Sequence, residues 1–225
     1  MKKQVVAIVG ILAATAIMIY LAALYGNRNR FDYLKDLDKT VFTLDGTDYQ
    51  LRDMTYYIAR QEKEIEKQAM DYDPDDTNAY WGLHTNGKFV RLEAKRAVLD
   101  RVVHDMMFYE AAKKEGMELD EKEQQYARDS ASDLCYDLSD EQKERAGLTD
   151  EEIYEMTDKA ALAEKYQKIL ADKEGENFGA YDYNGKAYEK MLEEHKLKVK
   201  KKFWDKVPFG NVTLNHKFED QEDES

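Results

Sequence analysis

The chain has 225 residues and a mass of 26.3 kDa, enough for one domain of ordinary size and an appendage. Its formal net charge is −13, and because the first 30 residues hold four basic residues and no acidic one, the remainder carries −17. A field of this sign repels phosphate backbones and argues against a nucleic-acid partner. The single cysteine, Cys135, excludes an intrachain disulfide and a zinc site built from thiolates.

The N-terminus predicts a membrane anchor. Residues 4–27 are 24 consecutive uncharged positions rich in Val, Ile, Leu and Ala, and about 20 such residues span a bilayer. A cleaved signal peptide is the alternative, but Leu24-Tyr25-Gly26 lacks the small residues that a cut at the end of the run requires. We therefore expect residues 1–30 to be an uncleaved transmembrane signal anchor. The short N-terminal side is expected in the cytoplasm, which makes this a single-pass protein of the cell membrane with its main domain on the extracytoplasmic side.

The first elements after the anchor are a hairpin and a helix. Residues 41–51 surround the dipeptide Asp45-Gly46, which suits a two-residue type I′ turn, so they predict a β-hairpin. Asp53 can cap a helix that runs to about Met70. From residue 71 to residue 87 the helical periodicity fails, and the composition predicts a loop.

A set of helices is expected in the middle of the chain. The longest covers about residues 88–115 and ends at Gly116. Its apolar positions recur at helical spacing: Leu92, Leu99, Val102, Val103, Met106 and Tyr109. Three later helices are predicted to begin with an N-cap whose side chain pairs with the third helical residue. These pairs are Asp120 with Glu123, Ser139 with Gln142, and Thr149 with Glu152, and the matching helix ends are Gly147 and Gly175.

The C-terminal part predicts one more helix and one strand. After a junction at residues 178–185, a last helix is expected to reach about Lys206. Within it, residues 196–202 would form a solvated lysine-rich face, with binding to acidic lipid or cell-wall polymer as the alternative. Residues 211–215 have a strand-like composition, and since an isolated hairpin is marginal in water, we expect them to join residues 41–51 in a sheet. The side chains expected to share that core are Val41, Leu44, Val212 and Leu214, with Phe203 or Trp204.

Two segments of the chain carry a family resemblance. Residues 41–54 read VFTLDGTDYQLRDM, and residues 97–123 read AVLDRVVHDMMFYEAAKKEGMELDEKE. The first is similar to the V-x-V-N-G-x-x-I-T-x-x-E start of the SurA/PrsA/trigger-factor-like chaperone domain. The second, which is more specific, resembles that family's v-L-d-x-L-I-x-x-k-L-l-x-x-e-A-k-k-x-G-i-x-v-s-d-e-E stretch. The likeness covers about residues 40–174, and residues 186–215 would be the family's C-terminal return.

The resemblance, with the pattern of elements, implies a mainly α fold. The anchor would be followed by a SurA N-terminal-like multi-helix domain at residues 31–215, with a small antiparallel sheet made of hairpin 41–51 and strand 211–215. Residues 216–225 would be an acidic tail.

The resemblance also implies a function, that of a membrane-anchored extracytoplasmic chaperone or foldase-like protein that binds unfolded or translocated polypeptides without ATP. Many members insert a parvulin-type prolyl isomerase domain where this chain has only residues 176–185. We therefore expect no catalytic residue and no cofactor. Two alternatives stay open: an assembly subunit that binds one specific protein partner, and a prolyl isomerase that keeps its activity without the insert.

Candidate binding residues are aromatic and methionine side chains, because adaptable apolar groups suit many client sequences. They are Tyr56, Tyr57, Tyr80, Trp81, Met106, Met107, Phe108 and Tyr109. The alternative for the helix at 88–115 is that its second apolar face packs on neighbouring helices. The four histidines are scattered without metal-ligand spacing, and the loop at Asp71 fails as a calcium loop because Asp76 and Gly82 replace its glycine and bidentate glutamate, so no metal is expected.

Overall fold

The computed structural model describes Met18, residues 31–85 and residues 87–215. A compact unit begins at Tyr33, and its buried side chains run from Asp36 to Leu214, so the unit has a hydrophobic core of its own. The expected anchor at residues 4–27 and the acidic tail at residues 216–225 lie outside the described part of the chain. Within that part, none of the helices combines the length and the apolar character that crossing a bilayer requires.

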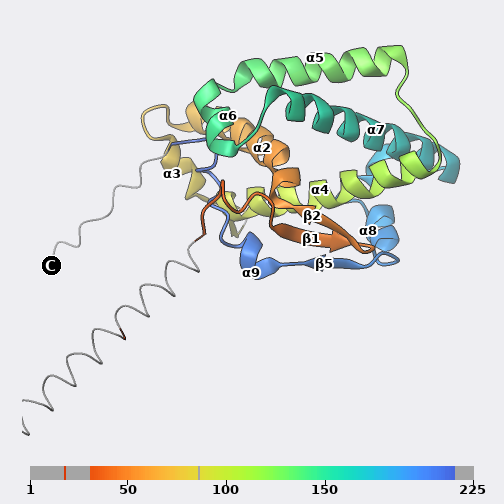
Figure 1. The fold of residues 1–225 in the computed structure, drawn as a ribbon, viewed down its shortest axis with the longest axis horizontal. Helices are drawn as coiled ribbons and strands as arrows, with labels where there is room; N and C mark the ends of the chain where they lie inside the picture. The colour runs from red at the N-terminus through yellow and green to blue at the C-terminus, as the bar shows by residue number, and fades with distance from the viewer. Residues whose placement is uncertain (1–17, 19–30, 86, 216–225) are drawn as a thin grey trace, which may run out of the picture. The chain divides into compact units, whose positions relative to one another are not determined.

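The unit is mainly helical and contains a small antiparallel sheet, as the sequence predicts (Figure 1). In chain order its elements are β1 (Thr40–Leu44), β2 (Thr47–Gln50), α2 (Leu51–Tyr72), α3 (Thr77–Trp81), β3 (His84–Thr85), β4 (Lys88–Phe89), α4 (Val90–Lys114), α5 (Glu121–Asp137), α6 (Asp140–Ala146), α7 (Asp150–Glu174), the 3-10 helix η1 (Phe178–Tyr181), α8 (Lys186–Leu192), β5 (Leu197–Val199) and α9 (Lys201–Trp204). Helix α5 lies on α7, α7 lies on α4, and the three-stranded sheet lies on the side away from α5.

Capping chemistry sets the helix boundaries where the sequence places them. The side chains of Asp120, Ser139 and Thr149 accept backbone N–H groups of the first turns of α5, α6 and α7. The left-handed glycines that follow α6 and α7 are Gly147 and Gly175. Helix α2 begins three residues earlier than expected: its N-cap is Gln50, and the carboxylate of Asp53 reaches back to the Gln50 amide at 2.7 Å instead of acting as the N-cap.

The sheet has the strand order β2-β1-β5. Its hairpin turn is the expected one, since Asp45 and Gly46 both have positive φ, 49° and 94°. Phe42 faces Tyr49 on one neighbouring strand and Val199 on the other, and the Phe42 and Tyr49 rings stack at 4.7 Å. This face of the sheet packs on the core, and the opposite face is open to solvent.

The expected last helix is wrong. Residues 186–206 form α8, then β5, then α9, because Leu197 and Val199 alternate with lysines and pair with β1. Lysine favours helices, but the burial of two alternating apolar side chains against a neighbouring strand outweighs that preference. The lysines at 196–202 therefore lie in and beside β5 and in the short helix α9, not on the face of one continuous helix.

The expected strand at residues 211–215 is also wrong, because this segment has no partner strand. Its backbone N–H groups donate to Glu62 of α2 instead: those of Gly210, Val212 and Thr213 lie 2.5 to 3.2 Å from the carboxylate oxygens. The expectation of shared burial holds, since these side chains are at most 7 % exposed: Val41, Leu44, Trp204, Val212 and Leu214. The C-terminal segment thus closes the core as a loop.

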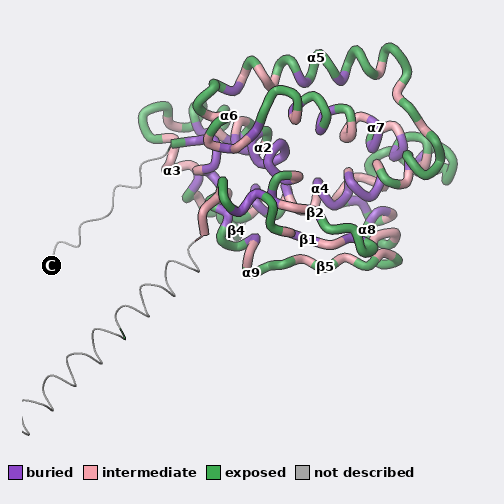
Figure 2. Tube along the Cα trace, in the orientation of Figure 1, coloured by how far each residue is buried: buried purple, intermediate pink, exposed green. Residues whose placement is uncertain are grey.

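Two smaller differences concern the region around residue 80. The expected loop at 71–87 contains the last two residues of α2, the short helix α3 and the two-residue strand β3, which pairs with β4 just after it. Leu92, expected on the apolar stripe of α4, is 59 % exposed. Figure 2 shows the buried positions concentrated in α2, α4, α7 and the sheet, whereas α5 is mostly exposed.

Candidate functional site

The structure buries most of the predicted binding residues. Six of the eight are at most 4 % exposed: Tyr56, Tyr57, Trp81, Met106, Met107 and Phe108. Tyr80 and Tyr109 are half-buried. The second apolar face of α4 therefore packs inside the domain, as the alternative interpretation holds, and these six side chains do not offer an exposed surface to a client.

Exposed aromatic side chains occur instead on α5. Only Ala127 and Ala131 of this helix are buried, and these small residues let it lie close to α7, its main neighbour. Tyr126 is 72 % exposed and Tyr136 is 91 % exposed. Because α5 is held chiefly by one neighbour, cavities open on two sides of it.

The first opening is a groove between α5 and the helices α2 and α4. It consists of two adjoining cavities of about 260 and 210 Å³, both lined by Tyr56, Arg60 and Ser130. We call it the α5 groove. Tyr126 of α5 and Phe178 of η1, which is 44 % exposed, line the larger cavity. The groove thus combines two exposed aromatic side chains with polar groups.

The floor of the α5 groove is a fixed hydrogen-bond network. The Thr157 hydroxyl of α7 lies 3.3 Å from the Tyr56 hydroxyl, within hydrogen-bond distance, and donates its own hydrogen to the Ile153 carbonyl at 2.7 Å. Tyr57 donates to Asp105 at 2.9 Å, and burial, followed by the nearby Asp105 charge, raises the pKa of Tyr57 well above its ordinary value. The Tyr57 hydroxyl is therefore a neutral donor at physiological pH, and partners on neighbouring helices set the positions of Tyr56 and Tyr57.

His104 connects this network to the wall formed by η1. Its Nδ1 lies 2.7 Å from a carboxylate oxygen of Asp105, and its Nε2 lies 2.9 Å from the Tyr181 carbonyl. Both partners are acceptors, so the ring serves both contacts when each nitrogen carries a hydrogen, as in the imidazolium form. Gln167 of α7 adds a donor to the Phe178 carbonyl at 3.0 Å. Helix η1 is thus attached to both α4 and α7.

Gly185, the N-cap of α8, lies against the backbone of η1, which forms this wall. A Cβ at this position would come closer to the carbonyl oxygens of Gly179 and Ala180 than real Cβ atoms approach, so only glycine fits between η1 and α8. A larger residue at position 185 would therefore force the backbone of η1 to move.

Charges of both signs line the α5 groove. Arg60 and Arg101 lie on one side, and the guanidinium of Arg101 lies over the Tyr183 ring at 5.1 Å. Glu164 and Asp133 lie on the helices opposite. At the end of α5, Lys63 donates to the Asp137 carbonyl at 2.6 Å, and Lys67 forms an ion pair with the Asp137 carboxylate at 3.1 Å. These two lysines fasten α2 to the end of α5.

A second cavity of about 460 Å³ lies between the end of α4, the start of α5 and α7. Its apolar wall includes Tyr109, Met117, Leu119 and Leu162. Lys159 lies over the Tyr109 ring at 5.9 Å. Two of the eight predicted residues thus meet an opening beside α5: Tyr56 in the groove and Tyr109 in this second cavity.

Sequence reasoning missed the residues that form the groove rim. They are Tyr126 and Phe178. Tyr126 could have been found, because it is a large aromatic residue on a helix that packs through alanines. Arg60, Arg101 and Gln167 carry no such signal, because their meeting depends on how four helices pack. His104 was interpreted as a surface or core histidine, and it is buried. No cluster of three or more His, Cys, Asp or Glu that could hold a metal occurs within residues 31–85 and 87–215.

Comparison with known proteins adds no relative: no family model matches the chain, and neither does any curated protein or solved structure. The resemblance to the SurA/PrsA/trigger-factor-like domain stays a prediction that depends on the two segments quoted above.

Proposed function

We propose that the chain is a membrane-anchored extracytoplasmic chaperone or foldase-like protein, of the SurA N-terminal-like type, that binds unfolded or translocated polypeptide without ATP. The observation that carries the proposal is the α5 groove, an open channel with aromatic rims and charges of both signs. The anchor at residues 4–27 and the family resemblance are independent sequence arguments for the same function.

The dimensions of the groove favour a peptide over a small molecule. Compact ligand sites are usually enclosed apolar pockets of about 300 to 1,000 Å³, whereas the two cavities here are smaller, open and lined about equally by polar and apolar groups. Cavities in series along a helix suit successive side chains of an extended chain. Tyr126 and Phe178 can contact apolar side chains, and Arg60 or Glu164 can pair with charged ones, which permits many client sequences.

The junction between α7 and α8 supports the proposal that the chain is not an isomerase. Residues 176–185 hold only η1 and its flanking turns. We expect residues 31–225 not to accelerate X-Pro isomerisation, a step that takes tens to hundreds of seconds without catalysis. A rate above background that survives further purification would reverse this part of the proposal.

Aggregation assays test client binding directly. Residues 31–225 should suppress the light scattering of two unrelated clients, heat-treated citrate synthase and reduced insulin, without ATP. Replacing Tyr126 and Phe178 with Ser should weaken suppression several-fold, because it removes the exposed aromatic rims of the groove. The matched control is Tyr136→Ser, which removes a tyrosine of the same helix that is 91 % exposed and does not line the groove.

The outcomes separate the candidate functions. Suppression of both clients, lost in the Tyr126/Phe178 variant and kept in the Tyr136 variant, supports the proposal. Absence of suppression, together with photo-crosslinking from position 126 in membranes to one protein only, would favour the assembly subunit. Equal loss of suppression in both variants would mean that client binding does not depend on the α5 groove.

A further inference from the structure

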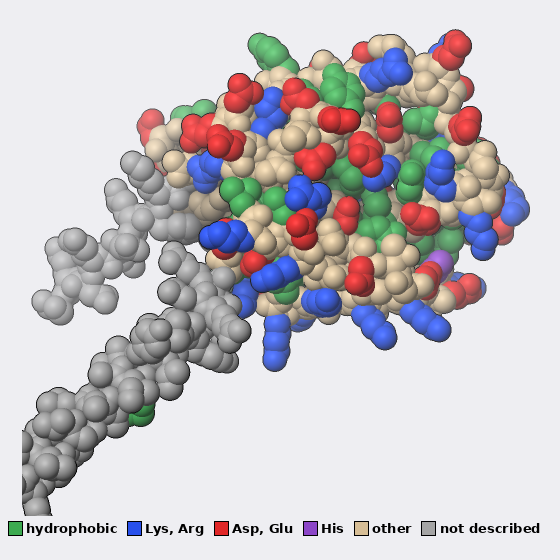
Figure 3. Space-filling view, in the orientation of Figure 1, with side chains coloured by type: hydrophobic (Ala, Val, Ile, Leu, Met, Phe, Trp, Pro, Cys, Tyr) green, Lys and Arg blue, Asp and Glu red, His purple; other side chains and the backbone are tan. Residues whose placement is uncertain are grey.

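Five exposed lysines form a basic strip along β5, its two flanking residues and the start of α9: Lys196, Lys198, Lys200, Lys201 and Lys202. None of the five is in an ion pair with another described residue. Figure 3 shows basic side chains projecting along the edge of the domain that β5 and α9 form, whereas acidic side chains gather over α5 and α7. The strip is thus a local basic surface on a domain of opposite charge.

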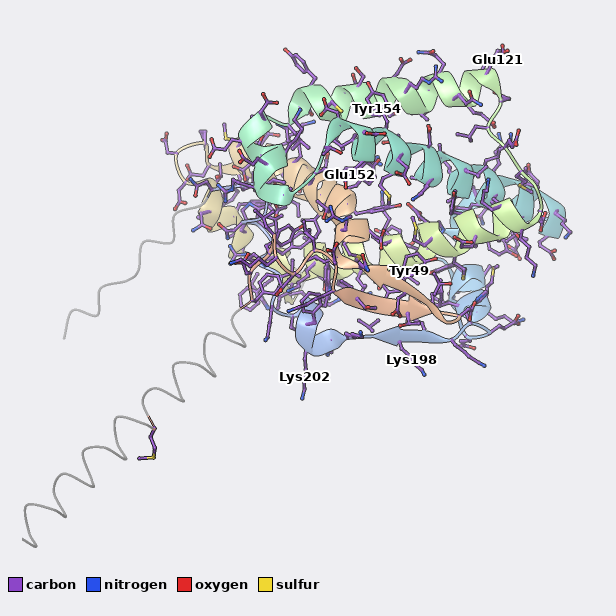
Figure 4. All side chains as sticks on the ribbon, in the orientation of Figure 1. Tyr49, Glu121, Glu152, Tyr154, Lys198 and Lys202 are labelled. Carbon is purple, nitrogen blue, oxygen red and sulfur yellow. The ribbon has the colours of Figure 1, made fainter. Side chains whose placement is uncertain are left out.

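Strand geometry places the lysines on one side. Leu197 and Val199 point toward the core, so Lys196, Lys198 and Lys200 share the solvent face, at a spacing of about 6.6 Å along the strand. β5 is an edge strand, and Lys198 and Lys202 both point away from the domain in the same direction (Figure 4). The cavities of the α5 groove do not include these residues.

Acidic side chains border the strip at its ends. Asp45 accepts from the Lys196 amide at 2.8 Å, lies 2.6 Å from His195 Nδ1, and interacts with the Lys196 charge. Glu193 and Glu194 precede Lys196 in the sequence, and Asp205 follows α9. The four lysines at 198, 200, 201 and 202 lie between these ends of the strip. The remaining acidic side chains are screened beyond about 8 to 10 Å in physiological salt.

We propose that the basic strip is a docking surface for the anionic phospholipid headgroups of a bilayer. Charge complementarity and the shape of the strip carry the inference, since ammonium groups that project the same way from a strand edge match a flat layer of phosphates. The inference rests on the proposed function in one respect, the membrane anchor. Only residues 28–32 lie between the uncharged run and the compact unit, and fully extended they span at most about 18 Å. If the proposed anchor spans the bilayer, a tether of this length keeps the domain near the membrane surface.

Vesicle sedimentation with residues 31–225 tests the strip without the anchor, because the core of the compact unit lies wholly within this fragment. At about 0.1 M salt the fragment should sediment with vesicles that contain about 30 % phosphatidylglycerol and not with pure phosphatidylcholine, and about 0.5 M salt should release it. Replacing Lys196, Lys198 and Lys200 with Gln should weaken binding by roughly 100-fold, at roughly fivefold for each lysine. The matched control replaces three exposed helix lysines, Lys114, Lys122 and Lys168, with Gln.

Each result decides the inference. Loss of vesicle binding in the strip variant alone, with an unchanged melting temperature, supports the inference. If that variant also still suppresses client aggregation, the strip acts independently of the α5 groove. Equal binding to both vesicle types, or equal loss in both variants, would overturn it. So would tighter binding to soluble polyphosphate than to vesicles, which would assign the strip to an anionic polymer. Vesicle binding that appears only after deletion of residues 216–225 would instead identify the chain's own acidic tail as the occupant.

Discussion

At the scale of single residues, the side chain that joins the two ends of the compact unit is Glu62. It is fully buried on α2 and accepts from three backbone amides and from the hydroxyl of Thr213, which lies 2.6 Å away. Burial raises its pKa, and these hydrogen bonds oppose that rise. Its position is visible in the sequence, since Ile58, Glu62, Ile65 and Ala69 share one face of the helix. A charge on an otherwise apolar stripe signals a buried polar contact, although the sequence does not name the partner.

Replacing Glu62 with Gln should destabilise the unit by about 2 to 4 kcal/mol, because an amide nitrogen would face buried N–H donors that lose their acceptor. Urea unfolding followed by circular dichroism measures the change. Glu64→Gln, at an exposed position of the same helix, is the control and should change stability by less than about 0.5 kcal/mol. Equal effects of the two substitutions would contradict the role given to Glu62.

Lys95 is the second charged residue in the core. Its ammonium donates to the carbonyls of Asp205 and Val207, both at 2.9 Å, and lies over the Trp204 ring at 5.6 Å. Burial lowers its pKa to about 8, since no carboxylate pairs with it closely enough to offset the loss of water. This residue therefore titrates differently in the folded and unfolded chains.

The stability contributed by Lys95 should rise with pH. Between about pH 8 and 10.5 the unfolded chain holds a proton on this lysine that the folded chain has released, so deprotonation favours folding. The free energy of unfolding of the wild type minus that of Lys95→Met should increase by about 1 to 2 kcal/mol from about pH 7.5 to 9.5. Titration of the buried tyrosines cancels in this difference. A difference that stays constant or falls over this range would show that the Lys95 pKa is not lowered.

At the scale of elements, sequence patterns succeeded where a few neighbouring residues decide the structure. The caps at Asp120, Ser139 and Thr149 and the Asp45-Gly46 turn are local, and the structure confirms them. β5 and the loop after it were mispredicted because their partners lie about 150 residues earlier: β5 pairs with β1, and the loop amides reach Glu62. The α5 groove is likewise a product of packing, since its walls come from five separate elements, α2, α4, α5, α7 and η1.

Truncation tests the C-terminal loop. A chain that ends at Pro208 loses the buried side chains of Phe209, Val212 and Leu214, worth about 5 to 9 kcal/mol together, and leaves Glu62 without its donors. A domain of this size has only about 5 to 15 kcal/mol of stability, so the truncated unit should lose its cooperative thermal transition. The control ends at Asn215 and should melt with the full chain. Unchanged melting of the shorter chain would mean that the loop does not close the core.

At the scale of the whole molecule, the proposed anchor would decide where the compact unit works. The full chain should pellet with membranes and resist alkaline carbonate, because an uncleaved apolar run of 24 residues is long enough to stay in the bilayer. Cell fractionation and N-terminal sequencing of the mature protein measure this. A soluble mature chain that begins near Asn27 would identify a cleaved signal peptide instead.

The contact between Glu62 and the C-terminal loop also sets an order of events during biosynthesis. The bonded residues are 148 to 151 positions apart, and a ribosome that adds about 5 to 20 residues per second needs roughly 7 to 30 s to make the second after the first. Until then α2 carries an ionisable group with no lasting partner, and the edge of β1 that will receive β5 is open. The unit therefore completes folding only after translation of its last segment, and a stalled nascent chain would leave Trp81 uncovered and open to quality-control proteases.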